Sequence, residues 1–302
     1  MIIVFGSIGL DIVQTVCHLP RPGETVLTAN YVMLPGGKGA NQALAAARAG
    51  GEVCFSASIG DDDFGQRALS NLAEAGVDLS AVARRSRPTA CATISVDGDG
   101  ENQIVVSSGA NLETTAAQLK AAPGDLVLQQ MEIPLSEICA GVDLAQQQGA
   151  QIILNAAPFH PIPPAILAKL DILIVNEVEA RMLADDLGLG ASDLSKVCAA
   201  AQRRFAMTVI LTLGANGAMA FAPDQTLRAG TLSLQALDTV GAGDAFVGAF
   251  VAAMANDASL ADCLRWGSVA GGLACLKPGA QDGVPDRAAI EARQDEISIS
   301  GL

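Results

Sequence analysis

The sequence predicts an α/β protein with a doubly wound, mostly parallel sheet that is flanked by helices, together with a small additional β-sheet. From Val53 onward, short apolar strands alternate with Ala-rich helical segments, which is the pattern of βαβ units. Further strand-like segments, at about 12–35 and 90–107, fall outside this alternation. Because no internal repeat, low-complexity segment or linker divides the chain, we expect a single domain over residues 1–302.

The chain opens with Ile2–Phe5, a continuous apolar run typical of a buried strand. Asp11 follows shortly after it, near the carboxyl end of the strand, where open α/β sheets bind ligands. The alternative is a surface Asp in a turn. The additional sheet is predicted from four segments, Ile12–Cys17, Thr25–Leu34, Ala90–Val96 and Gln103–Ser107, with a hairpin turn at Asp97-Gly98-Asp99-Gly100. The alternative is that these four segments are edge strands of the main sheet.

Short apolar runs predict the later strands, Val53–Ile59, Leu126–Met131, Ile152–Leu154, Ile172–Val175, Thr208–Thr212, Ala218–Phe221 and Thr226–Ala229. Capping residues and apolar periodicity predict helices at about 61–76, 176–187, 260–276 and 287–297. Three consecutive acids, Asp61 to Asp63, open the first of these helices. We interpret them as a start favoured by the helix dipole rather than as a metal site.

The amino-acid composition limits which residues can form the core and which partners the protein can bind. Hydrophobic residues make up 50% of the sequence and aromatic residues only 3%, so the core must be built from Ala, Val, Leu and Ile. A net charge of -14 without a basic run argues against nucleic acid as a partner. No apolar run approaches the roughly 20 residues of a spanning helix, so no membrane partner is expected. Seven scattered cysteines are interpreted as small buried residues in a reducing cytoplasm, and two histidines are too few for zinc sites or Ser-His-Asp triads.

Two glycine-rich turns each lead into an Ala-rich helix. The turn at 36–42 precedes a helix at Ala43–Ala49, and the turn at 238–244 precedes one at Ala245–Ala255. Small residues let a ligand approach the backbone, and the free N–H groups of a first helical turn favour an anion. Asp244 lies within the second anion site. A carboxylate there is repulsive to phosphate unless it takes a proton from an attacking hydroxyl, the alternative being a helix cap.

Together, the two turns resemble the two signatures of the ribokinase (PfkB) family of carbohydrate kinases. Gly-Gly-Lys-Gly-Ala-Asn at 36–41 matches the sugar-binding turn, and Asp-Thr-Val-Gly-Ala-Gly-Asp at 238–244 matches the catalytic turn. The resemblance runs from Met1 to about Pro285. It implies a ribokinase-like fold in which the small sheet is a lid over the sugar, and often a homodimer through lid-to-lid packing. It also implies ATP with Mg²⁺, and K⁺ as a further cation.

The resemblance implies transfer of the γ-phosphoryl group of ATP to a hydroxymethyl of a pentose, with D-ribose as the expected acceptor. Asp244 is the implied base, and the N–H groups of Gly241, Ala242 and Gly243 stabilise charge on the transferring group. The implied sugar site comprises Gly9, Asp11, Gly37, Lys38, Gly39, Asn41, Glu132 and Asp244. For Glu132, the alternative is that it is simply an acidic residue that precedes a helix.

Two further sets are implied. The nucleotide set comprises Asn176, Glu179, Thr212, Gly214, Asn216, Gly217, Gly243 and Ser268, and the potassium set comprises Asp238, Val240, Ala274, Lys277, Gly279 and Gly283. Asn176 and Glu179 would position hydrated Mg²⁺ and the phosphates, the alternative being a capping box, and both can hold.

The chain departs from the family pattern at two positions. Gly9 stands where many ribokinases have Asn, which leaves the sugar open, and Gly283 replaces a Ser at the cation site. The open alternatives are another sugar, a nucleoside (adenosine, inosine or pseudouridine), for which a single Tyr and a single Trp offer a poor base clamp, or a non-catalytic sugar-binding regulator. No G-x-G-x-x-G follows the first strand, which excludes a Rossmann dehydrogenase.

Overall fold

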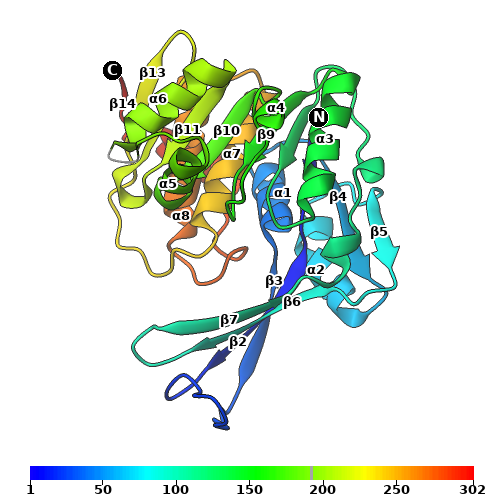
Figure 1. Ribbon diagram of the computed structural model, residues 1–302. Helices are drawn as coiled ribbons and strands as arrows, with labels where there is room; N and C mark the ends of the chain where they lie inside the picture. The colour runs from blue at the N-terminus through cyan, green and yellow to red at the C-terminus, as the bar shows by residue number, and fades with distance from the viewer. Residues whose placement is uncertain (191–192) are drawn as a thin grey trace.

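The computed structural model describes residues 1–190 and 193–302 and contains a large and a small sheet (Figure 1). The large sheet has ten strands in the order β14-β13-β12-β11-β10-β9-β8-β1-β4-β5. From β5 to β11 in this order all neighbours are parallel, and β12 to β14 continue the sheet antiparallel. The predicted doubly wound, mostly parallel sheet is confirmed. Its strands are β1 (Ile2–Phe5), β4 (Val53–Gly60), β5 (Val82–Arg85), β8 (Leu126–Gln129), β9 (Gln151–Asn155), β10 (Ile172–Asn176), β11 (Thr208–Thr212), β12 (Ala218–Phe221), β13 (Thr226–Ala229) and β14 (Ile299–Gly301).

Helices cover both faces of this sheet, so the central strands are buried on both sides. In β1, Val4 belongs to the core on one face and Ile3 to the core on the other. The first core is closed by α1 (Lys38–Arg48), α2 (Asp63–Glu74), α7 (Ala242–Ala255), α8 (Leu260–Ala274) and α9 (Arg287–Arg293). The second is closed by α3 (Leu135–Gln148), α4 (Pro164–Leu167), α5 (Glu177–Asp186) and α6 (Leu194–Phe205).

Small residues let α1 and α7 lie against each other. A Cβ atom at Gly248 would lie 2.6 Å from the carbonyl oxygen of Gln42, so only glycine fits there without a shift. The Ala-rich, aromatic-poor composition therefore serves close helix packing. It places the first turns of the two helices that follow the glycine-rich turns side by side.

The small sheet has four strands in the order β3-β2-β6-β7 and projects away from the body (Figure 1). Its strands are β2 (Gly9–Thr15), β3 (Tyr31–Gly36), β6 (Ala90–Val96) and β7 (Asn102–Ser107). Asp97 closes the β6–β7 hairpin, because its Oδ1 accepts from the N–H groups of Asp99 and Glu101, each at 3.0 Å. The small sheet is therefore separate, as predicted, and its strands are not edges of the main sheet.

Several predicted boundaries were wrong. β2 begins at Gly9 rather than Ile12, because Gly9 to Asp11 already pair with β3 and β6. β3 begins at Tyr31 rather than Thr25, because its partner β2 ends at Thr15 and nothing remains to pair with the earlier residues. The helix predicted over 287–297 ends at Arg293 and continues as a 3₁₀ turn, η4 (Gln294–Glu296). The remaining 3₁₀ turns described are η1 (Gly109–Glu113), η2 (Ala116–Gln118) and η3 (Gly214–Asn216).

The seven thiols are all free, but their predicted burial was only partly right. Cys198, Cys263 and Cys275 are buried, whereas Cys17 is exposed and the others are half-buried. Cys17 follows the end of β2 at the tip of the small sheet, beyond the reach of either core. Within residues 1–190 and 193–302, no helix combines the length and apolar character needed to cross a membrane.

Candidate active site

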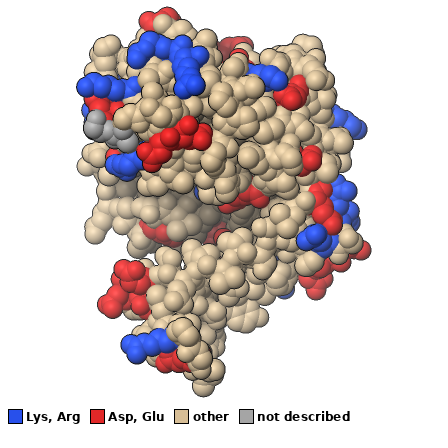
Figure 2. All heavy atoms as spheres, in the orientation of Figure 1, with Lys and Arg blue, Asp and Glu red and all other residues tan. Residues whose placement is uncertain are grey.

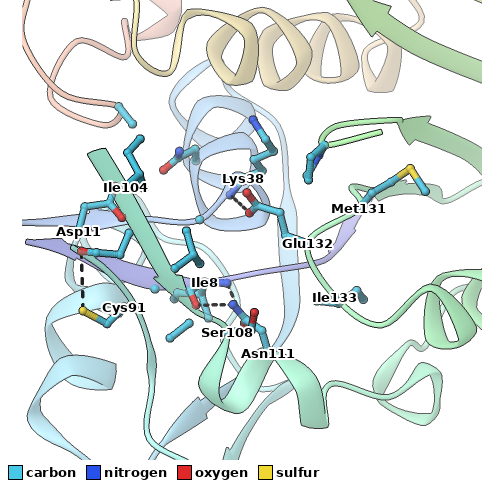
Figure 3. A pocket seen from close by; sticks show the side chains of 18 of the residues that line it. Ile8, Asp11, Lys38, Cys91, Ile104, Ser108, Asn111, Met131, Glu132 and Ile133 are labelled. Carbon is cyan, nitrogen blue, oxygen red and sulfur yellow. Dashed lines mark hydrogen bonds between the residues drawn. The ribbon is translucent and has the colours of Figure 1, made fainter. Parts of the chain in front are cut away.

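A cavity of about 930 Å³ lies where the small sheet meets the carboxyl ends of the central strands. Figure 2 shows the hollow between the body and the projecting sheet, with acidic side chains along it. Residues far apart in the sequence meet in its wall (Figure 3). Of the residues predicted for sugar, catalysis and cation binding, the wall contains Gly9, Asp11, Gly37, Lys38, Asn41, Glu132, Val240, Gly241 and Asp244.

Glu132 anchors the first glycine-rich turn. Its Oε2 accepts from Ser7 Oγ at 2.5 Å and from the backbone N–H of Lys38 at 2.8 Å. Gly37, at φ 90°, is the N-cap of α1, and a Cβ at Gly39 would lie 2.6 Å from the backbone of Ser7. Gly39 therefore lies just beneath the wall and lets α1 approach the end of β1.

Asp11 faces the cavity from β2, and within the described residues its carboxylate has no hydrogen-bond donor. Gly36 leaves room for it, since a Cβ there would lie 2.5 Å from Asp11 Oδ2. Burial, and secondarily the charge of Glu132, raise the pKa of Asp11 to about 6. A half-buried carboxylate without donors is costly, and two hydroxyl groups of a ligand would supply what it lacks.

Asp244 occupies the first turn of α7 and is buried. Gly241 caps the helix at φ 77°, and a Cβ there would lie 2.6 Å from Ala280. A Cβ at Gly243 would meet nothing within 4 Å, so the space over this turn is open to a ligand. Of the three N–H groups predicted to stabilise charge, that of Ala242 already donates to Thr239 O at 3.2 Å. The predicted anion site would therefore rest mainly on the N–H groups of Gly241 and Gly243.

Lys38 is surrounded by acids from three elements. Its pKa is raised chiefly by Asp244, and further by Glu132 and Glu179, against the opposing effect of burial. Burial raises the pKa of Glu179, while its hydrogen bond to Asn176 and the charge of Lys38 oppose this. The charge of Lys38 therefore interacts with acids of both the predicted sugar set and the predicted nucleotide set.

The predicted nucleotide residues lie outside this cavity. Asn176 and Glu179 form a capping box, with Glu179 N–H donating to Asn176 Oδ1 at 2.9 Å and Asn176 N–H to Glu179 Oε2 at 2.8 Å. Ser268 is buried in α8, and its Oγ has no partner within the described chain. Thr212 ends β11, and Gly214, Asn216 and Gly217 follow it in and after η3. Gly243 lies in the first turn of α7.

The predicted cation residues come from loops that are tied together. Asp238 accepts from Val240 N–H at 3.0 Å and from Gly279 N–H at 2.8 Å. Gly283 lies so close to Ala274 that a Cβ would overlap the Ala274 carbonyl oxygen, so a Ser there would require a backbone shift. Lys277 is exposed. Within the described residues no cluster of three or more His, Cys, Asp or Glu side chains could hold a metal ion.

Sequence reasoning missed the polar side chains that hold this site. Asn111 clamps the chain before β2, because its amide accepts from Ile8 N–H at 3.1 Å and donates to Ile8 O at 3.0 Å. Several others lie at strand ends or directly after a motif residue, which is a usable signal. They are Ser7, Gln42, Gln130, Asn155 and Gln281.

A carboxylate without hydrogen-bond donors and a buried acid in the open first turn of a helix line one cavity, an arrangement suited to phosphoryl transfer to a small hydroxylated substrate. The family model described as pfkB family carbohydrate kinase matches residues 1–287, and the chain belongs to this family. It is a carbohydrate kinase that uses ATP. Among its relatives, the ribokinase of Haemophilus influenzae is 34% identical, with 94% of this chain and 95% of that protein covered.

Solved structures agree with this assignment. Thermotoga maritima ribokinase superposes with a TM-score of 0.90 at 31% identity, covering 97% of this chain and 98% of that chain. Arabidopsis thaliana ribokinase, solved in complex with ribose and ATP, superposes with a TM-score of 0.87 at 29% identity and the same coverage.

Proposed function

We propose that this protein is a ribokinase, which transfers the γ-phosphoryl group of ATP to the 5-hydroxyl of D-ribose. The observation that carries the proposal is the position of Asp11 and Asp244 in the wall of one cavity. Asp11 accepts from two sugar hydroxyls, and Lys38, Asn41 and Glu132 complete the sugar site. Asp244 accepts the proton of the 5-hydroxyl as its oxygen attacks the γ-phosphorus. The N–H groups at the start of α7 stabilise the charge on the transferring group.

The cavity supports a sugar rather than a nucleoside as the acceptor. Its wall has aliphatic side chains and a single imidazole, His160, and it contains no Phe, Tyr or Trp among the described residues. A base would therefore find no aromatic ring to stack on. The experiment is ADP release with ATP and a panel of pentoses, hexoses and nucleosides. D-ribose should give the highest kcat/KM, and a nucleoside with the highest kcat/KM would overturn the proposal.

We infer that Mg²⁺ accompanies ATP. Asn176, at the end of β10, and Glu179, in the first turn of α5, would position it through water, and they offer few direct ligands, which suits an ion that keeps several waters. The ion would neutralise charge on the phosphates. Thr212, Gly214, Asn216, Gly217 and Ser268 are proposed to line the nucleotide site.

Potassium should activate the enzyme more than sodium. Asp238, with the carbonyl of Val240, lies directly before the anion site, and its hydrogen bond to Gly279 ties the two loops. An ion held there would fix the Gly241–Asp244 turn and act mainly on kcat. Further ligands would be the carbonyl groups of Ala274, Lys277, Gly279 and Gly283. The measurement is turnover at fixed ionic strength in potassium, sodium and tetramethylammonium chloride. Equal rates in all three would exclude a functional cation site.

We further infer a homodimer through the lid, and a cytoplasmic location. The edge strand β7 exposes Ile104, Val105 and Val106, and an exposed apolar edge strand invites pairing with a second copy. Sedimentation of the Val105→Glu variant, compared with that of the parent protein, would show whether β7 forms the dimer interface. Free thiols at all seven cysteines and the use of ATP suit a reducing cytoplasm.

A further inference from the structure

Gln42 lies behind the proposed general base and is completely buried. Its Nε2 donates to Asp244 Oδ1 at 2.8 Å and to Asn155 Oδ1 at 2.9 Å. Its Oε1 accepts from Gln130 Nε2 at 2.7 Å. Both N–H bonds and the carbonyl of this amide are therefore used, and each partner comes from a different element.

The direction of these hydrogen bonds follows from the carboxylate. An ionised Asp244 can only accept, so Gln42 must turn its NH₂ group toward it. The Gln42 carbonyl then faces Gln130, which must donate, and Gln130 Oε1 is left without a partner in the described chain. Asn155 is fixed in turn, because its Nδ2 donates to Ile174 O at 3.2 Å. The central strands thus set the orientation of the Gln42 amide.

The second carboxylate oxygen has a different support. Asn41 Nδ2 donates to Asp244 Oδ2 at 3.0 Å, Gln281 Nε2 donates to Asn41 Oδ1 at 2.9 Å, and Asn71 donates to Gln281 at 2.9 Å. Asn41 lines the cavity, so a bound sugar can compete for its amide. Gln42 does not line the cavity, and its hydrogen bond to Asp244 is therefore free to persist when the sugar binds.

We propose that Gln42 is a positioning residue for the phosphoryl-transfer reaction, held by Gln130 and Asn155 so that one oxygen of Asp244 stays fixed while the other faces the substrate. This inference rests on the proposed role of Asp244 as the base. The fixed donor prevents rotation of the Asp244 side chain.

The primary test is Gln42→Met, which keeps the volume and removes the donor. It should lower kcat by about 10- to 100-fold, because small displacements of a reacting group are costly. The KM values for sugar and ATP should stay within about threefold, since Gln42 touches neither half of the cavity.

Gln118→Met is the matched control. Gln118 also bridges elements through its amide, donating to Ala57 O at 2.7 Å and to Ala81 O at 3.3 Å, but it lies beside β4 and β5, away from Asp244. Thermal unfolding of both variants compares their loss of stability. Gln118→Met should leave kcat unchanged. If Gln42→Met does the same, or if both variants lower kcat alike, the positioning role is overturned.

Gln130→Met tests whether the support acts through Gln42. Alone, it should lower kcat about 3- to 10-fold, and in the Gln42→Met background it should cost less than about twofold, because the residue it supports is already lost. If the two substitutions lowered kcat independently, so that their effects multiplied, the support of Gln42 by Gln130 would be refuted. Asp244→Asn, measured in the same assay, distinguishes a failure of the proposed base from a failure of the role of Gln42. If that variant stays active, the proposed base is wrong, whereas an inactive Asp244→Asn beside a fully active Gln42→Met refutes only the role of Gln42.

Discussion

Asp244→Asn should lower kcat by about 10²–10⁴, which is the usual contribution of general-base catalysis. Asparagine preserves the shape of the side chain and most of the packing at the start of α7. However, an amide cannot accept the proton of the sugar hydroxyl, and its NH₂ group would face the donating amides of Asn41 and Gln42. The KM values for sugar and ATP should change by only a few fold, since neither ligand depends on this residue alone for binding. Steady-state kinetics with each substrate varied in turn is the measurement.

Asp125→Asn provides a control of the same chemistry. Asp125 is buried like Asp244 but precedes β8 at the opposite end of the sheet, where it accepts from Ala122 N–H at 2.8 Å. This variant should lose some stability and keep its turnover. If Asp244→Asn retained more than about a tenth of the parent kcat, the residue would not be the base.

The parts of the fold that the sequence predicts are those with a local cause. The strands Thr208–Thr212 and Ala218–Phe221 have the predicted bounds because their apolar runs end at turn residues. By contrast, β14 is an Ile-Ser-Gly segment, too short to show a strand pattern, and it is a strand only because it pairs with β13. β5 was also missed, since its Val-Ala-Arg-Arg sequence has no buried face of its own and depends on pairing with β4.

The candidate site divides in the same way. Lys38 and Asp244 belong to continuous motifs, so residue type and spacing predict them, and Asp11 is predicted from its position after the first strand. The residues that hold them are contributed by the fold. Gln42 and Asn155 are 113 residues apart, and their hydrogen bond forms only because the fold brings the start of α1 to the end of β9. The sequence predicted Asp11 near the carboxyl end of β1, whereas it lies within the strand β2 of the small sheet, so the small sheet and the predicted sugar site share one element.

Asp11→Ala should raise the KM for the sugar by about 10- to 150-fold and leave the KM for ATP nearly unchanged. Charge-assisted hydrogen bonds contribute about 1.5–3 kcal/mol each, and a tenfold change corresponds to about 1.4 kcal/mol. Asp11 lies in the lid, whereas the proposed nucleotide residues lie at β10 and β11. Asp99→Ala, in the exposed β6–β7 turn of the same sheet, should leave both KM values unchanged. If Asp11→Ala raised both KM values equally, the assignment of separate sugar and nucleotide halves of the cleft would be refuted.

The pH dependence of the same residue gives an independent measurement. Because the pKa of Asp11 is raised to about 6, the parent protein should lose sugar affinity as the pH falls through 6 and the acceptor becomes a neutral acid. For stability the sign is opposite. A carboxyl group whose folded pKa exceeds its unfolded value near 3.8 stabilises the fold below that value, and this contribution is lost as the pH rises through 6. Asp11→Ala should therefore be at least as stable as the sugar-free parent at pH 8, and its sugar KM should not rise between pH 7 and 5. A variant that is clearly less stable at pH 8, with the same rise in KM as the parent, would show that Asp11 holds the lid together rather than the sugar.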